Sequence, residues 1–170
     1  MKRILGLFSI IILAAFTAEA QTLKFGHINS DELIQAMPEF DSANVKLENL
    51  QKELMNTLEL MSVELNNKSE TYNKESKNYT DLVRQTKEQE LVDLNRRIQD
   101  FQTNAQSQFQ NRQIELLQPI YAKVDKALKD LGKENGFVYI FDIAKGGLVF
   151  YDETKSTNVM PLARAKLGLK

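Results

Sequence analysis

Few residues in this sequence have the types and spacing that chemistry requires. His27 is the only histidine and there is no cysteine, so the imidazole and thiolate ligands that zinc prefers are not present as a set. Asp142, Asp152 and Glu153 lie close together in the sequence, but carboxylates that act as general acid and base need a cleft and a partner group. We interpret them as solvated residues at the ends of strands. The sequence therefore predicts no catalytic residue, no cofactor and no metal ligand, and the protein is not expected to be an enzyme.

A second set of residues suggests binding rather than catalysis. Between residues 66 and 90 the chain is polar, and its sparse apolar side chains include Tyr72, Tyr79, Leu82 and Val83. These side chains could complete the contact between two packed helices, or they could bind apolar groups of another polypeptide. The sequence leaves both interpretations open, and one residue could serve in both.

Two long helices are predicted to carry these residues. Residues 41–79 contain no Gly or Pro, and their apolar side chains recur every three or four positions on one helix face, at Leu47, Leu50, Leu54, Leu58, Met61 and Leu65. A second stripe runs from Leu91 to Leu131, and Thr86-Lys87-Glu88-Gln89 matches a capping box at its start. Because the connector near 80–86 is short, we predict an antiparallel coiled-coil arm over residues 41–134.

Segments typical of strands flank the arm on both sides. Residues 24–28 predict a short strand, and residues 137–151 predict an apolar β-hairpin that turns at Gly146-Gly147. Short helices are expected after Asn29 and near the end of the chain. The predicted fold class is α+β, mainly α, in one domain over residues 21–170, with the β body formed by residues 23–40 and 135–170.

The predicted hairpin raises the question of what covers it. It is apolar on both faces, which is typical of strands that are buried on both sides. Three strands are too few to close a barrel, and an open sheet would leave apolar edges exposed. We therefore expect several copies to join their strands in one shared β core. The residues expected in this oligomer core are Phe25, Ile28, Phe137, Val138, Tyr139, Ile140, Phe141, Leu148, Val149 and Phe150.

The first twenty residues have the composition of a signal peptide. Lys2 and Arg3 precede the uncharged run from Ile4 to Phe16, and Ala18-Glu19-Ala20 is a small-residue cleavage pattern. The apolar run is shorter than the roughly 20 residues that a spanning helix needs. We predict cleavage after Ala20 and export to the periplasm.

The remaining chain is nearly neutral. Subtracting the charged residues of the signal segment leaves 20 basic (22 − 2) and 22 acidic (23 − 1) side chains. A chain of this charge has no general attraction to nucleic acid, so no nucleic-acid partner is expected.

The order of these segments resembles the Skp/OmpH-like family of periplasmic chaperones over essentially the whole mature chain. The resemblance rests on "LKFGHINSDELIQAMPEF" as strand and first helix, "TKEQELVDLNRR" at the start of the returning helix, and the closing segment "NGFVYIFDIAKGGLVFYDETKSTNVMPLARAKLG". It implies a homotrimer with a β-barrel body and three helical arms that enclose unfolded outer-membrane proteins, and it implies transient contact with the membrane surface. Well-known members are strongly basic, whereas this chain is not.

Two functions of different class follow from the sequence. The first is an ATP-independent holding chaperone that binds unfolded outer-membrane β-barrel proteins between its arms. The second is a structural coiled-coil spacer or adaptor of the cell envelope that binds one folded partner. A spacer should have an arm whose apolar stripe is fully used between the helices, whereas a chaperone should bind many unfolded chains weakly.

Overall fold

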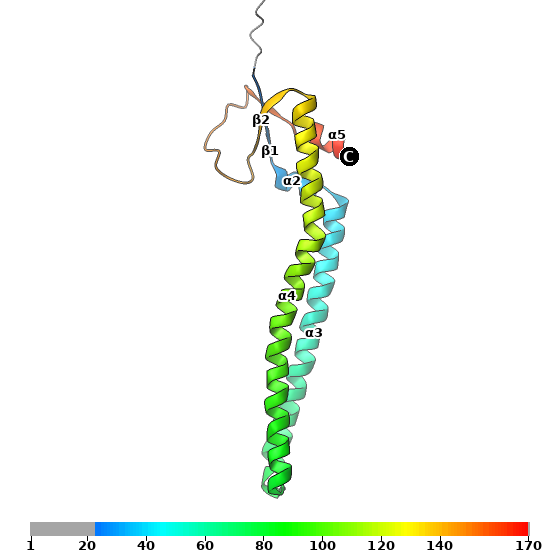
Figure 1. Cartoon of the computed structure of the whole chain (residues 1–170), viewed down its shortest axis with the longest axis vertical. Helices are drawn as coiled ribbons and strands as arrows, with labels where there is room; N and C mark the ends of the chain where they lie inside the picture. Colours follow the sequence, from blue (N-terminus) through cyan, green and yellow to red (C-terminus); the bar gives the residue numbers. More distant parts are fainter. Residues whose placement is uncertain (1–22, 170) are drawn as a thin grey trace, which may run out of the picture.

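The computed structural model describes residues 23–169 and shows a long two-helix arm joined to a small body (Figure 1). The body contains a three-stranded sheet and two short helices. The predicted α+β class, mainly helical, is confirmed. The predicted signal peptide, residues 1–20, lies outside the described residues.

The arm consists of α3 (Pro38–Glu75), the short 3-10 helix η2 (Ser76–Asn78) and α4 (Asp81–Glu134). At ~1.5 Å per residue, α3 and α4 are roughly 57 and 81 Å long. Pro38 suits the first turn of α3, where its missing N–H would have no helical partner. The two helices run side by side and in opposite directions (Figure 1). Two contacts between them show this: Lys123 near the body contacts Glu39, and Glu90 near the far end contacts Lys68.

The predicted start of the second helix at Thr86 is wrong. The helix begins at Asp81, and the side chain of Thr80 accepts a hydrogen bond from the Val83 N–H at 3.4 Å. The Thr86 hydroxyl instead donates to the Leu82 carbonyl inside the helix. The capping-box pattern was therefore a chance match within α4, and a simpler threonine cap six residues earlier starts the helix.

The sheet contains β1 (Lys24–Ile28), β2 (Phe137–Asp142) and β3 (Ser156–Asn158) in the order β2-β1-β3, and both pairs are parallel. Parallel neighbours need a crossover connection. Between β1 and β2 this connection is the whole arm, preceded by α2 (Ser30–Gln35). The two ends of the arm are therefore held together by the hydrogen bonds of β1 to β2.

The predicted β-hairpin over 137–151 is also wrong. Residues 143–155 form no strand, and the third strand is β3. The physical reason lies at the end of β2. The Ile143 N–H donates to the Ile28 carbonyl at 2.8 Å, and the Asp142 carboxylate accepts from the backbone of Ser30. These bonds hold the chain against β1 and α2, and the loop then leads to the opposite edge of the sheet (Figure 1).

The core of the body lies between one face of the sheet and the helices. It combines α2, the end of α4 near the body and α5 (Met160–Leu167), and its largest fully buried side chains are Ile28, Leu33, Met37, Leu131 and Val159. Gly26 of β1 allows this close approach. A Cβ at that position would lie 2.9 Å from Cγ1 of Val159 and 3.1 Å from the ring of Phe137.

Candidate functional site

The far end of the arm contains two tyrosines for which the sequence left two roles open, packing between the helices and binding of another polypeptide. Tyr72 of α3 donates its hydroxyl to Glu88 of α4, and Tyr79 in the connector donates to Glu75 at 2.9 Å. Their rings lie 6.3 Å apart. The pKa of both tyrosines is raised, because each carboxylate accepts a hydrogen bond from the neutral phenol. Both hydroxyls are thus occupied within the arm.

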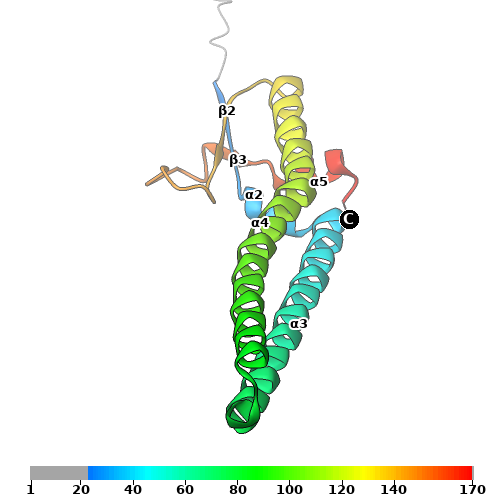
Figure 2. The same ribbon diagram turned by 60° about the horizontal axis from the view of Figure 1, so that its bottom comes forward.

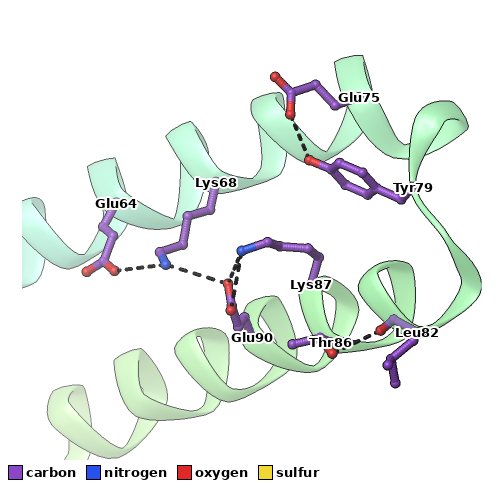
Figure 3. Close-up of polar contacts among 8 residues, drawn as sticks. All are labelled: Glu64, Lys68, Glu75, Tyr79, Leu82, Thr86, Lys87 and Glu90. Atoms are coloured by element: carbon purple, nitrogen blue, oxygen red, sulfur yellow. Dashed lines mark hydrogen bonds and ion pairs between the residues drawn. The ribbon is translucent and has the colours of Figure 1, made fainter.

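A row of charged side chains joins α3 to α4 beside these rings (Figure 3). The Nζ of Lys68 lies 3.7 Å from the Glu64 carboxylate and 3.8 Å from that of Glu90, and the Nζ of Lys87 lies 3.1 Å from Glu90. These side chains are between 41% and 49% exposed, so each pair contributes only about 0–1 kcal/mol. Of these three contacts, the one between Lys68 and Glu90 joins α3 to α4.

The other two predicted binding residues are free of such contacts. Leu82 is 74% exposed and Val83 is 40% exposed, and Leu82 is directed away from α3 (Figure 3). The structure therefore divides the predicted set of four. Tyr72 joins α3 to α4 through Glu88, and Tyr79 packs beside it and bonds to α3. Leu82 and Val83 form a small exposed apolar surface at the end of the arm.

The apolar contact between α3 and α4 is unevenly distributed along the arm. Near the body, Ala43 and Leu47 of α3 are buried, and Ile120 and Val124 of α4 are buried at the same level. In the outer half only Leu94 and Ile98 of α4 are buried. Between residues 99 and 119 of α4 the described chain has no buried side chain.

This middle stretch contains an open groove of about 760 Å³ between the two helices. We call this groove the mid-arm groove. In Figure 2 the ribbons of α3 and α4 lie apart between the far end of the arm and the body. Sequence reasoning missed the groove, although residues 99–113 are rich in glutamine and asparagine. The groove is lined mainly by polar side chains, including Asn49, Leu50, Asn104, Ser107, Gln108 and Asn111.

Apolar side chains of β1, β2 and the loop after β2 are left partly or fully exposed in the described chain. Phe25 and Tyr139 stack with ring centroids 6.3 Å apart, and Tyr139 and Phe141 stack at 5.8 Å. Tyr139 is 59% exposed, and in the loop after β2 Val149 is 101% and Phe150 80% exposed. We call these five residues, with Val138, the outer apolar surface. It contains most of the residues predicted for the oligomer core.

The remaining residues of that predicted set lie elsewhere. Ile28 is 1% exposed and belongs to the core of its own chain, and Phe137 and Ile140 pack against this core from β2. Leu148 is half-buried in the loop that follows β2. Any shared core can therefore use these four residues only partly, since much of their surface is already covered.

Asp142 has a structural role that the sequence did not reveal. Its carboxylate accepts hydrogen bonds from the backbone N–H and the hydroxyl of Ser30, at the start of α2, and from the N–H of Ala144. Burial raises the pKa of Asp142, but these hydrogen bonds and the nearby Lys145 outweigh it and the pKa is lowered. Asp142 is thus a half-buried residue that connects β2 to α2 rather than a solvated strand end.

His27 is also held by structural contacts. It is 8% exposed, its Nδ1 lies 2.9 Å from the Ser156 hydroxyl, and its ring lies 4.5 Å from that of Tyr151. Among residues 23–169 no three His, Cys, Asp or Glu side chains are grouped so that they could hold a metal ion. Within the same residues, no helix has the length and apolar character needed to cross a membrane.

A comparison with protein families finds a match over most of the chain. A family model described as outer membrane protein (OmpH-like) matches residues 24–165, which is nearly all of the described chain. A search among curated proteins found no match. The matched region includes every strand of the body and both helices of the arm.

Proposed function

Because this chain belongs to the OmpH-like family, whose members are periplasmic chaperones of outer-membrane proteins, we propose that it is a holding chaperone. It binds unfolded outer-membrane β-barrel proteins, keeps them from aggregating and uses no nucleotide. The observation that carries the proposal is the match over residues 24–165. It covers the arm and the body together rather than one common helical segment.

The architecture supports holding rather than spacing. A spacer needs a stiff arm with a saturated apolar contact, yet α3 has no buried side chain beyond Leu47. Apolar residues such as Leu60 and Leu82 are 71% and 74% exposed on the arm. A long polar surface with scattered apolar side chains suits weak binding of many unfolded chains, since no single contact is strong.

We further propose that the working unit is a homotrimer assembled through the outer apolar surface. In one chain this surface is exposed, and β2 and β3 each have one edge without a neighbouring strand. Such edges and aromatic faces favour association. Three copies that join their sheets would cover both features and leave the arms extending from a common body. Transient contact with the membrane surface follows from the family resemblance alone.

The test of the holding function is suppression of aggregation. A urea-unfolded outer-membrane β-barrel protein is diluted into buffer with an equal concentration of the trimer, and light scattering is followed at low and high salt. We expect suppression at both salt concentrations, because this near-neutral chain depends little on long-range attraction that salt screens beyond about 8–10 Å.

The result also separates the two candidate functions. No suppression at either salt concentration would contradict the chaperone and favour the envelope spacer. Suppression that disappears at moderate salt would keep the chaperone function, but it would show that charge attraction is the main source of binding.

A further inference from the structure

The mid-arm groove contains polar side chains that have no hydrogen-bond partner in their own chain. Asn49, Asn104, Ser107, Gln108 and Asn111 make no side-chain hydrogen bond or ion pair with any residue from 23 to 169. All five side chains are exposed in the single chain. The groove is thus lined by uncommitted donors and acceptors.

The charges at the groove cancel. Arg112 pairs with Glu115 at 2.6 Å, and Lys46 and Glu53 on α3 are of opposite sign. A nucleic acid or an anionic lipid would need an excess of positive charge, which this groove lacks. A neutral ligand with many hydrogen-bonding groups fits it better.

The side chains of the groove match one such ligand, the polypeptide backbone. An amide side chain offers both a donor and an acceptor, and an extended chain offers one N–H and one C=O at every residue other than proline. Because the backbone is the same for every sequence, a lining of amides binds it without selecting side chains. Leu50 adds one apolar contact.

The dimensions of the groove are also suitable. Its α4 wall runs from Asn104 to Glu115, a rise of about 17 Å at ~1.5 Å per residue. An extended chain advances ~3.3 Å per residue, so about five residues would lie along this wall. A volume of about 760 Å³ falls within the ~300–1,000 Å³ typical of ligand sites.

We propose that the mid-arm groove binds an extended backbone segment of the unfolded client. This inference rests on the proposed chaperone function and assigns its main polar contact to Asn49, Asn104, Ser107, Gln108 and Asn111. Leu82 and Val83 at the end of the arm then supply apolar contacts to neighbouring parts of the same client.

The test uses two matched triple variants of the full-length trimer. The groove variant is Asn104→Ala/Gln108→Ala/Asn111→Ala. The control is Gln102→Ala/Gln106→Ala/Gln113→Ala, which removes exposed amides from the same part of α4 that do not line the groove. Alanine favours the helix in both, so circular dichroism should show equal helicity. Binding of a fluorescently labelled, urea-unfolded outer-membrane protein gives the Kd of each.

We expect the groove variant to bind about fivefold or more weakly, because several hydrogen bonds of modest net strength are lost, and the control to bind as the wild type does. Equal Kd values for the wild type and both variants would overturn the groove assignment while leaving the chaperone function intact. If the wild type itself binds no unfolded client, the proposed function fails, and the groove assignment fails with it.

A second measurement locates the client directly. The chain has no cysteine, so Ser107→Cys and Gln106→Cys each introduce one site for a benzophenone maleimide. We expect photocrosslinks to the unfolded client from position 107 and few from position 106. Crosslinks from position 107 to a second copy of this chain, in the absence of client, would show that the groove is an interface between copies and would overturn the proposal.

Discussion

At the scale of single residues, the body depends on two positions that the sequence does not mark. No turn or helix cap explains why residue 26 is a glycine. The reason is the close approach of Val159 and Phe137, which leaves no room for a Cβ. From the sequence, Asp142 was interpreted as a solvated residue at the end of a strand, but in the structure it joins β2 to α2 through Ser30. Both roles depend on contacts between segments that are far apart in the chain.

We predict that Gly26→Ala destabilises the body. The new Cβ would lie 2.9 Å from Cγ1 of Val159, a fully buried side chain that has little room to move. Overpacking of this kind costs about 1–3 kcal/mol, which urea unfolding can measure. Gly132→Ala is the control, because its Cβ would meet Ile140 at an ordinary 3.5 Å within a helix and alanine favours the helix. Equal stability of the two variants would contradict the role of Gly26.

We predict that Asp142→Asn lowers stability at neutral pH and that the loss shrinks in acid. The folded-state pKa of Asp142 is below its unfolded value of about 3.9. Its ionised form therefore stabilises the fold above the unfolded pKa, and this contribution is lost as pH falls through the folded pKa. We expect a loss of about 1–3 kcal/mol at pH 7, measured by urea unfolding from pH 7 to pH 3.

The matched control for this substitution is Asp100→Asn, on the exposed surface of α4. It should change stability little at any pH. A loss for Asp142→Asn that stays constant across the whole pH range would show that shape, rather than charge, is what the carboxylate provides.

At the scale of elements, the regular helices were predictable and their ends were less so. The stripes from Leu47 to Leu65 and from Leu91 to Leu131 predicted long helices, and the structure contains α3 and α4 at those positions. Thr80 and Thr86 are both plausible caps in sequence. The choice between them depends on where η2 turns the chain, which is a property of the packed arm.

For the strands, too, the local segments were predictable from the sequence, whereas the connection between them was not. Residues 24–28 and 137–142 are strands as predicted, because a run of apolar and β-branched residues is a local signal. Gly146-Gly147 is also a local signal, and both residues have positive φ values of 75° and 88°. The hairpin nevertheless does not form, since the bonds from Ile143 and Asp142 to distant residues redirect the chain.

Among the candidate sites, the sequence suggested Leu82 and Val83 as client contacts and an apolar oligomer core, and both assignments stay predictions. Sequence reasoning could not separate the tyrosines from Leu82 and Val83, because their hydroxyl partners Glu75 and Glu88 become neighbours only after folding. It missed the mid-arm groove, because a stripe predicts which residues face a neighbouring helix but not how closely the helices approach.

We predict uneven amide exchange along α4. Residues 99–115 include the α4 wall of the mid-arm groove and lack buried side chains, whereas residues 120–131 contain Ile120, Val124 and Leu131. Local opening costs little free energy where few apolar contacts are lost. Hydrogen exchange measured by mass spectrometry should therefore be faster at 99–115 than at 120–131. Equal protection of the two segments would indicate a closed, rigid arm.

At the scale of the whole molecule, the open question is what covers the outer apolar surface. We predict that Val149→Glu lowers the oligomeric mass and the Tm. Val149 is 101% exposed in the single chain. The new charge should therefore leave the stability of the single chain unchanged, and it should lower stability only if another copy covers this position. Light scattering measures the mass, and calorimetry measures the Tm at several protein concentrations.

Leu60→Glu is the matched control, because Leu60 is 71% exposed on the arm, far from the sheet. It should keep the wild-type mass. If Val149→Glu also keeps the mass and the Tm of the wild type, the loop after β2 is not part of the interface between copies.

The placement of the arm between β1 and β2 also constrains how the protein can fold after synthesis. Ser30 and Asp142, which close the body, are 112 positions apart. Contacts of such high contact order form slowly, because a long loop must close before they are made. The arm can form first from local contacts, and its completion brings the ends of the loop together. A chain synthesised from its amino-terminal end therefore holds β1 unpaired until β2 and β3 have followed.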